Sequence, residues 1–289
     1  MIILRIYRSD GQYDVHQLDV KPETKLLTLF EQIRTTVDPT FAFTSGCRHG
    51  ICGSCAVKVN GKPVPACKTE IGSFHSGVLR IEPLNEEAPK IDLLSDFTEF
   101  DRSFSRFPNF LEPNGLPHPE NYETEATRCI QCGICFYSCP VVKLDKEFWG
   151  PAAALKNERF LSDPADNITV SRLEEAREGI YQCVKCYRCT EYCPRSLDPE
   201  KAIEKTRTRC LTRPQETIGT FHTKALFDSI YHYGKINETF TARYLYGFWG
   251  SLPLILSGLP FLWKRRVRLR PVRAAKLKEI RRLLEMEND

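Results

Sequence analysis

Apolar and polar positions alternate through much of the first hundred residues, a pattern that predicts strands. Ile2, Leu4 and Ile6 take every second position of the opening segment, and an Asp-Gly pair at residues 10–11 then signals a hairpin turn. Further strands are expected over residues 13–18, 56–59 and 78–81.

One predicted helix interrupts this strand-like region. Its apolar residues recur at the spacing of one helix face: Leu26, Leu27, Leu29, Phe30 and Ile33. Thr24, just ahead of them, is a candidate N-cap. Residues 1–105 therefore predict a small mixed sheet with one packed helix.

The pattern changes after this region. Residues 107–120 are rich in proline, glycine and asparagine, which indicates a linker or a wrapping loop. Helical segments follow at residues 152–155 and behind Ser171, which has Glu174 three residues later as in a capping box. The chain thus predicts an α+β protein, with a sheet domain over residues 1–105, an all-α domain over 106–218 and a helical tail over 219–289.

The tail contains an uncharged stretch, residues 244–263, that is long enough to cross a bilayer. Glycine and proline interrupt it repeatedly, and the basic residues 264–266 follow directly. The stretch can pack on a partner subunit, lie on an anionic membrane surface or span the bilayer. We favour packing on a partner, because broken segments are tolerated in lipid only where protein covers them. The end of the chain predicts a basic, solvated helix.

Cysteine is unusually frequent, with thirteen in 289 residues. In a secreted protein this number would suggest disulfides. The start of the chain, with charges at Arg5, Arg8 and Asp10, does not resemble a secretory signal. We therefore expect a reducing compartment and cysteines that bind metal. The net charge of +4 is a mild excess and predicts no nucleic-acid partner.

The first cysteine group follows the spacing of plant-type [2Fe–2S] proteins. Its members are Cys47, Cys52 and Cys55, then Cys67 after eleven residues, sooner than in that type. Glycines at positions 46, 50 and 53 allow unusual backbone angles, so that N–H groups can point at the sulfurs. A zinc site or unrelated thiols are the competing interpretations. Zinc usually joins two short C-x2-C hooks, whereas this loop is a tighter wrap.

Two later runs repeat one spacing, that of bacterial ferredoxins with two clusters: CIQCGICFYSCP at residues 129–140 and CVKCYRCTEYCP at 183–194. Three cysteines of each run can hold three corners of one cube, and the cysteine before proline then binds the other cluster. This predicts a [4Fe–4S] cluster on Cys129, Cys132, Cys135 and Cys193. It predicts a further centre on Cys139, Cys183, Cys186 and Cys189. Two zinc knuckles would leave the repeated Cys-Pro ending unexplained.

Twelve cysteines are then ligands, and Cys210 remains as a buried small residue or an idle thiol. His49 lies inside the first loop, but four cysteines suffice there, so we expect it at the surface or an interface rather than as a Rieske-type ligand. The sequence shows no G-x-G-x-x-G after a strand, no Walker motif and no catalytic set. Three clusters without a two-electron cofactor predict an electron conductor between two partners.

SGCRHGICGSCAVKVNGKPVPAC at residues 45–67 resembles the [2Fe–2S] segment of the iron–sulfur subunit of succinate dehydrogenase and fumarate reductase. CIQCGICFYSCP resembles that family's second cluster motif, and the order and spacing agree over residues 1–210. The resemblance implies a β-grasp, plant-type ferredoxin domain followed by an all-α, bacterial-type ferredoxin domain. It also implies a flavoprotein partner carrying FAD, where succinate and fumarate interconvert.

The chain departs from the common family form at three places. That form has a [3Fe–4S] centre with no cysteine at the position of Cys186, a histidine at that of Val184 and a tryptophan shortly after that of Pro140. Here Cys186 would complete a [4Fe–4S] centre, and a [3Fe–4S] centre remains the alternative without it. The changes resemble an atypical branch whose membrane partner carries CCG motifs. Residues 221–263, with Gly-x-x-Asn-Glu at 234–238, resemble part of the small heterodisulfide reductase subunit.

The resemblance thus implies an electron-transfer subunit of succinate:quinone oxidoreductase or fumarate reductase, in the respiratory chain and the tricarboxylic acid cycle. Its partners would be the FAD flavoprotein and a membrane-associated subunit that reacts with quinone or carries CCG domains. It would lie peripherally at the cytoplasmic face of the inner (plasma) membrane. Alternatives are a thiol-driven fumarate reductase subunit, a heterodisulfide-reductase-like carrier and a stand-alone ferredoxin-like carrier, against which the uncharged tail argues.

Overall fold

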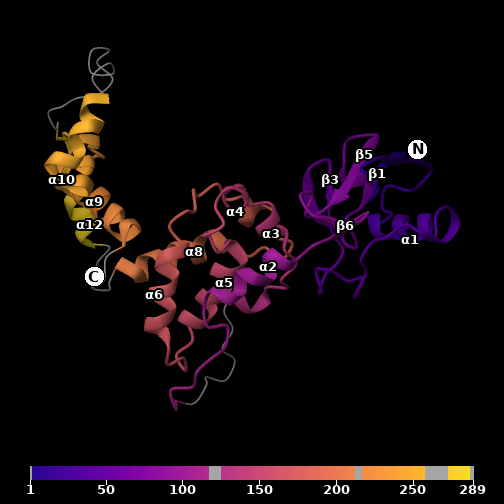
Figure 1. Ribbon diagram of the computed structural model, residues 1–289, viewed down its shortest axis with the longest axis horizontal. Helices are drawn as coiled ribbons and strands as arrows, with labels where there is room; N and C mark the ends of the chain where they lie inside the picture. Colours follow the sequence, from indigo (N-terminus) through magenta and orange to yellow (C-terminus); the bar gives the residue numbers. More distant parts are fainter. Residues whose placement is uncertain (1, 117–124, 212–216, 258–272, 287–289) are drawn as a thin grey trace. The chain divides into compact units, whose positions relative to one another are not determined.

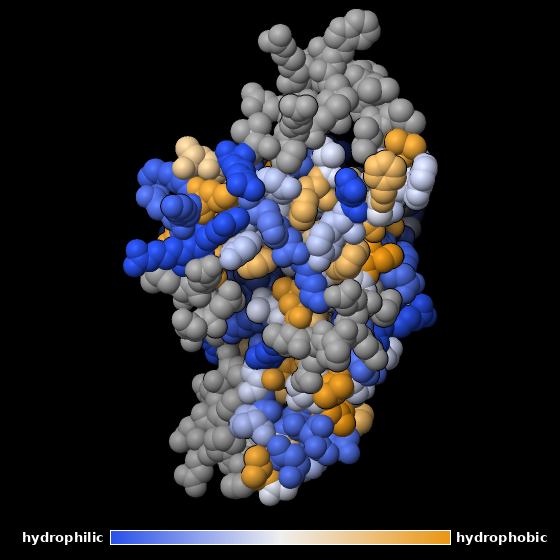
Figure 2. All heavy atoms as spheres, turned by 90° about the vertical axis from the view of Figure 1, so that its left-hand side faces the viewer, coloured by the Kyte–Doolittle hydropathy of each residue, from blue (hydrophilic) through white to orange (hydrophobic). Residues whose placement is uncertain are grey.

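The computed structural model describes residues 2–116, 125–211, 217–257 and 273–286 (Figure 1). The chain forms two compact units, Met1–Thr208 and Arg209–Asp289. The finer division at residues 105/106 and 218/219 stays a prediction. On the coloured part of the face shown in Figure 2, hydrophobic residues lie among hydrophilic ones.

A five-stranded mixed sheet begins the first unit. Its strands are β1 (Ile2–Tyr7), β2 (Tyr13–Leu18), β3 (Ala56–Val59), β4 (Lys62–Pro65) and β5 (Val78–Pro83). The order is β2-β1-β5-β3-β4, and β1 and β5 run parallel while the other neighbours are antiparallel. The predicted hairpin is confirmed, since Tyr7 lies opposite Tyr13.

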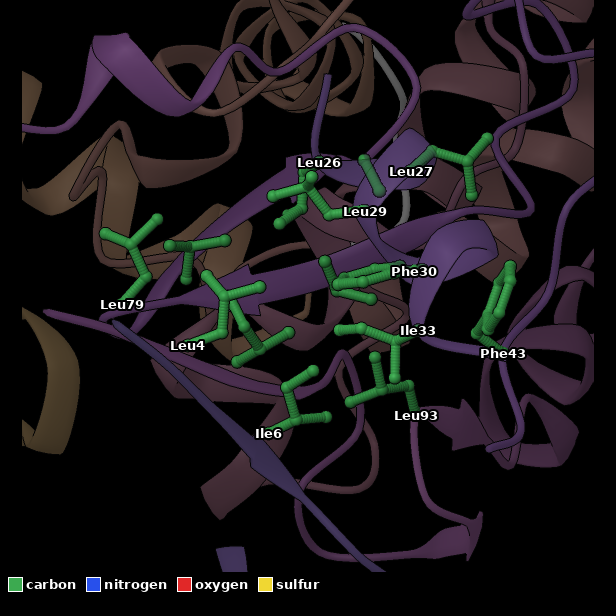
Figure 3. Close-up of a cluster of buried hydrophobic side chains, with 14 of the residues drawn as sticks. Leu4, Ile6, Leu26, Leu27, Leu29, Phe30, Ile33, Phe43, Leu79 and Leu93 are labelled. Carbon is green, nitrogen blue, oxygen red and sulfur yellow. The ribbon is translucent and has the colours of Figure 1, made fainter. Parts of the chain in front are cut away.

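The helix α1 (Leu26–Thr36) packs on this sheet. Its buried residues Leu26, Leu29, Phe30 and Ile33 meet Leu4, Ile6 and Leu79 of the strands (Figure 3). Burying each such side chain stabilises the fold by about 1.5–3 kcal/mol. The predicted mixed sheet with one packed helix is therefore confirmed, because the period-2 and helical patterns place their apolar faces in one common core.

Two predicted helix caps are wrong. α1 begins behind Lys25 with no capping side chain, and Thr24 instead accepts a backbone bond from Ile71 N–H at 3.0 Å. The helix α6 (Thr169–Gly179) starts before Ser171, which therefore lies inside its first turn. Ahead of α1, the backbone of Thr24 is thus bonded to a distant segment, while its side chain makes no cap.

Short elements continue the first unit. Between β4 and β5 lies η1 (Ile71–Ser73), and after the sheet strands come β6 (Pro89–Ile91), β7 (Leu94–Ser95), α2 (Thr98–Ser103) and η2 (Phe104–Arg106). Then follow η3 (Glu125–Arg128), α3 (Ile134–Tyr137), α4 (Pro140–Leu144), α5 (Pro151–Leu161), α6, α7 (Arg188–Glu191) and α8 (Pro199–Leu211). Phe100 packs edge-on against Phe104 and Phe136, with ring centroids 5.1 and 5.5 Å apart, and so joins α2 to α3.

The loop after η2 wraps over α6, as predicted for residues 107–120, whose last four residues lie outside the described part of the chain. Arg172, which is 0% exposed, donates hydrogen bonds to the carbonyl groups of Pro108 and Phe110. Its guanidinium also pairs with the buried Asp166 at 2.8 Å. One side chain therefore holds the loop on the helix.

The second unit contains the helices α9 (Ile218–Tyr233), α10 (Glu238–Ser257) and α12 (Leu277–Met286). The Gly-x-x-Asn-Glu motif forms the turn between α9 and α10. Gly234 has a φ of 72°, and a Cβ on it would lie 2.6 Å from Ala274 Cβ, so only glycine fits. The Asn237 side chain accepts a hydrogen bond from Phe240 N–H at 2.9 Å and caps α10. Turn geometry thus accounts for this motif.

α10 contains the described part of the uncharged stretch. It is kinked at Gly247, where φ is 68° and ψ is −176°. Residues 258–263 and the basic residues 264–266 lie outside the described part of the chain. Within the residues that the structure describes, no helix has both the length and the apolar character needed to cross a bilayer. The predicted terminal helix is confirmed as α12.

Arg172→Met retains much of the side-chain volume but leaves Asp166 buried without its cation. Breaking a buried ion pair costs about 3–5 kcal/mol, so the midpoint of thermal unfolding should fall by about 10 °C. Arg102→Met, at an exposed position of α2, is the control and should shift the midpoint by less than about 2 °C. Circular dichroism of cluster-loaded protein measures both, and an unchanged midpoint for Arg172→Met would show that the loop needs no such anchor.

Candidate metal centres

Backbone N–H groups surround the first cysteine of the loop that precedes β3. Cys47 Sγ accepts hydrogen bonds from the N–H groups of His49, Ile51 and Cys52 at 3.2–3.4 Å. N–H groups directed at one point form a concave site that attracts a negatively charged group. The loop is therefore suited to a group that carries negative charge on sulfur, as an iron–sulfur cluster does.

Two of the three glycines in this loop have the backbone angles predicted for them. Gly50 and Gly53 adopt φ values of 75° and 73°. The same prediction is wrong for Gly46, which has no positive φ. Lack of space explains why position 46 is a glycine, because a Cβ there would lie 3.0 Å from Cys52 Sγ.

Thiol acidity differs across the loop. The Ser54 hydroxyl, 3.2 Å from Cys52 Sγ, is the largest of several hydrogen-bond contributions that lower the pKa of Cys52 to about 6. Burial raises the pKa of Cys55 to about 12, and Cys67 is buried beside it. The loop therefore favours negative charge on Cys52, whereas burial disfavours an uncompensated thiolate at Cys55.

A single cavity gathers cysteines from both later runs. Cys129 and Cys132, ahead of α3, and Cys135, in its first turn, line it together with Cys193 from the second run. Leu155 and Leu197 form part of its wall. Burial raises the pKa of Cys132 to about 11 and that of Cys135 well above the ordinary value. The cavity brings together the four cysteines predicted to bind one [4Fe–4S] cluster.

The remaining cysteines form a second cross-connected group. Burial raises the pKa of Cys139, which precedes α4, and the thiolates of Cys186 and Cys183 raise it further. Burial likewise raises the pKa of Cys189, in α7, to about 12, with Cys183 and Cys139 among its charged neighbours. Within the described residues, no three ligating side chains stand at the spacing of a single metal ion. The cysteine before each proline lies among cysteines of the other run.

The three cysteine groups are neighbours in one unit. A Cβ added to Gly53 would lie 2.7 Å from Cys132 Cα, so the first loop touches the second group through bare backbone. Cys135 of the second group interacts electrostatically with Cys189 of the third. The first group therefore adjoins the second, and the second adjoins the third.

The sequence predicted the positions of some other residues near the cysteines, but not of all of them. His49 is exposed and Cys210 is buried in α8, as expected. Ser54 stands between the predicted ligands Cys52 and Cys55 in the sequence. Its position alone could therefore have predicted a hydroxyl close to a ligand sulfur. Lys156 acts electrostatically on Cys129, and Lys185 pairs with a carboxylate on α8. These lysines could not be found from spacing, because the fold alone brings their partners near.

The comparisons with known proteins agree with this arrangement. The family described as "2Fe-2S iron-sulfur cluster binding domain" matches residues 3–102, and "4Fe-4S dicluster domain" matches residues 125–197. The fumarate reductase iron–sulfur subunit of Haemophilus influenzae is 32% identical over 221 residues, which cover 68% of this chain and 86% of that protein. A fumarate reductase (CoM/CoB) chain of Methanothermobacter marburgensis is 36% identical over 199 residues, covering 66% of this chain and 40% of that protein.

A solved structure, the Mycobacterium smegmatis Sdh1 complex in the apo form, contains a chain that is 26% identical, with a TM-score of 0.66. The match covers 75% of this chain and 98% of that chain. The fold and the cysteine groups define an iron–sulfur protein with a 2Fe–2S domain and a 4Fe–4S dicluster domain. The chain belongs to the family of the iron–sulfur subunits of fumarate reductase and succinate dehydrogenase, which transfer electrons within oxidoreductase complexes.

Gly53→Ala tests the contact between the first two groups. Its Cβ would be strained by the positive φ and would also collide with Cys132, whereas at Gly61 the φ of 77° leaves nothing within 4 Å of a new Cβ. Left-handed backbone alone costs an L-residue roughly 1–2 kcal/mol, so Gly61→Ala should lower the thermal midpoint by about 5 °C.

Gly53→Ala should lower that midpoint at least twice as much and should also reduce the iron bound per chain. Thermal unfolding and iron assays measure the two effects. Equal thermal midpoints and equal iron contents in the two variants would contradict a tight contact between Gly53 and Cys132.

Proposed function

We propose that the chain is the electron-transfer iron–sulfur subunit of a succinate:quinone oxidoreductase or fumarate reductase. It passes electrons between the FAD of a flavoprotein subunit, where the substrate reacts, and a membrane-associated partner that reacts with quinone or carries CCG domains. The observation that supports this function best is the series of adjoining cysteine groups, with Gly53 on Cys132 and Cys135 beside Cys189.

In this proposal the ligands fall into three sets. The [2Fe–2S] set is Cys47, Cys52, Cys55 and Cys67. The [4Fe–4S] set is Cys129, Cys132, Cys135 and Cys193. The third set is Cys139, Cys183, Cys186 and Cys189. When bound, such clusters take up and release single electrons at potentials set by burial and by hydrogen bonds to sulfur.

The chain provides each set with a different environment. Cys47 receives three N–H bonds, and Cys52 receives a hydroxyl contact. The second set lies at a cavity between α3, α5 and the segment behind Cys193. In the third set Cys189 is buried, whereas Cys186 is exposed. These residues thereby tune the three centres separately and shield the second one from water.

The third centre is assigned as [4Fe–4S], with Cys186 as its fourth ligand. The closeness of Cys186 to Cys139 supports this assignment, since the two thiols interact electrostatically. A [3Fe–4S] centre without Cys186 is the alternative. The subunit lies peripherally at the cytoplasmic face of the inner (plasma) membrane, and the uncharged tail provides a surface for a partner or for the membrane.

A second candidate function is that of a thiol-driven fumarate reductase subunit. One relative, 36% identical, is named a fumarate reductase (CoM/CoB) subunit. The resemblance of residues 221–263 to a heterodisulfide reductase subunit points the same way. In that case electrons from a thiol donor, rather than from quinol, reach the flavoprotein through the same three cysteine sets.

Isolation of the tagged chain with its partners from native membranes tests the proposed function. We expect an FAD-containing subunit in the complex, and succinate should bleach the visible absorption of the clusters while fumarate restores it. A complex with bound flavin that responds to neither compound would contradict the proposal. Bleaching by thiol donors without any response to quinol would favour the thiol-driven function.

Cys186→Ala distinguishes the two types of third centre. Oxidised, anaerobic wild-type protein should lack a [3Fe–4S] signal in low-temperature EPR, while the variant should show one and lose about one iron per chain. Cys210→Ala removes a buried thiol outside the proposed sets and should leave the iron content unchanged. A strong [3Fe–4S] signal in fresh wild-type protein would show that Cys186 is not a ligand.

A further inference from the structure

The loop that carries Cys186 is held by little packing. Val184 is 66% exposed and Tyr187 is 52% exposed, and Cys186 between them is exposed as well. Lys185 and Tyr187 adopt φ values of 53° and 60°, a left-handed conformation that costs L-residues free energy. Such a loop needs an external restraint to keep one conformation.

Lys185 contacts a cysteine of the third set with its backbone and the helix α8 with its side chain. Its backbone N–H donates to Cys183 Sγ at 3.4 Å. Its Nζ lies 2.8 Å from Glu204 Oε1 and 3.7 Å from Glu200 Oε1, both on α8. The backbone of Lys185 therefore lies at a cysteine of the third set, while its side chain is anchored to a helix of thirteen residues.

The Glu200 carboxylate gives this anchor a fixed position. Its side chain is only 4% exposed, and its Oε1 has no hydrogen-bond partner among the described residues. A buried carboxylate without its cation is unfavourable, so Lys185 is drawn toward α8. Glu204, at the surface of the same helix, completes the pair of acceptors.

We infer that Lys185 is a positioning residue that holds Cys186 within reach of the third centre. The inference rests on the proposed ligand set, in which Cys186 is the fourth ligand. The ion pairs with α8 fix the residue directly before Cys186 and offset the strain of the left-handed loop. Without them the loop explores other conformations, and Cys186 is away from its iron for a larger fraction of the time.

Oxidation with ferricyanide measures this effect. The oxidant removes one electron from a [4Fe–4S]²⁺ centre, which then releases one Fe²⁺ and leaves [3Fe–4S]⁺, a species visible by EPR. At a fixed ferricyanide dose, Lys185→Ala should form about three times as much of this species as wild type, the factor expected of a partly exposed ion pair. Lys185→Arg keeps the charge and should restore near wild-type behaviour.

Two further variants keep the result interpretable. Lys201→Ala removes an exposed lysine from the same helix, α8, and should leave the signal at the wild-type level. Glu204→Gln removes the negative charge of the ion pair instead of the lysine, at a surface position, so it should raise the signal even if Lys185→Ala fails to fold. A dithionite-reduced portion of each preparation, taken before ferricyanide is added, should show the EPR signal of the reduced [2Fe–2S] centre and so reports that the rest of the chain is intact.

The outcomes separate this inference from the proposed function. Wild-type behaviour of both Lys185→Ala and Glu204→Gln, together with full conversion in Cys186→Ala, would overturn the role of Lys185 and keep Cys186 as a ligand. No change in Cys186→Ala would overturn the ligand assignment and the inference with it. A raised signal in Lys185→Ala and Glu204→Gln, with Lys201→Ala unchanged, supports the positioning role.

Discussion

A tight turn such as Cys129 to Cys135 can present three sulfurs to one side of a cubane cluster, but the fourth corner is out of reach of the next cysteine in line. The helical half of the first unit is arranged around this constraint. Cys139 lies among cysteines of the second run, and Cys193 lines the cavity of the first. Pro140 then opens α4 at a position where its missing N–H would have no helical partner. Segments 54 residues apart in the sequence are thereby connected twice.

Burial of the thiols also makes their ionisation energetically unfavourable. Desolvation raises the pKa of Cys135 and Cys189, so their deprotonation inside the folded protein requires a positive ion nearby. Folding of the helical half and binding of iron therefore stabilise each other. The sheet domain also has an apolar core, formed by Leu4, Phe30 and Leu79 among others, and the buried Cys55 and Cys67 belong to it. Its stability therefore draws on apolar burial as well as on the surroundings of two buried thiols.

The sequence predicts well wherever one periodicity or spacing decides the structure. The alternation at residues 2–6 and the Asp-Gly pair determine the hairpin, and the cysteine spacing indicates which cysteines meet. The sequence predicts poorly where a contact between distant segments determines the structure. The start of α1 depends on Thr24 meeting Ile71, and the wrapping loop depends on the buried guanidinium of Arg172. The contact of Gly53 with Cys132 has no local signal either, because any glycine in a cysteine loop has the same backbone freedom.

Motifs shared with other proteins differ in how much they say about function. The Gly-x-x-Asn-Glu segment is explained by a left-handed Gly234 and an Asn237 cap, so any chain with this turn between two helices would favour the same residues. It therefore discriminates weakly between partners. The loop around Cys186 is different, because its exposed residues and positive φ angles oppose stability and local turn preferences do not require a cysteine there. A costly conformation persists only where surrounding contacts enforce it, and we infer this role for the ion pairs of Lys185 with Glu200 and Glu204. The proposed [4Fe–4S] character of the third centre therefore depends on this loop more than on the turn between α9 and α10.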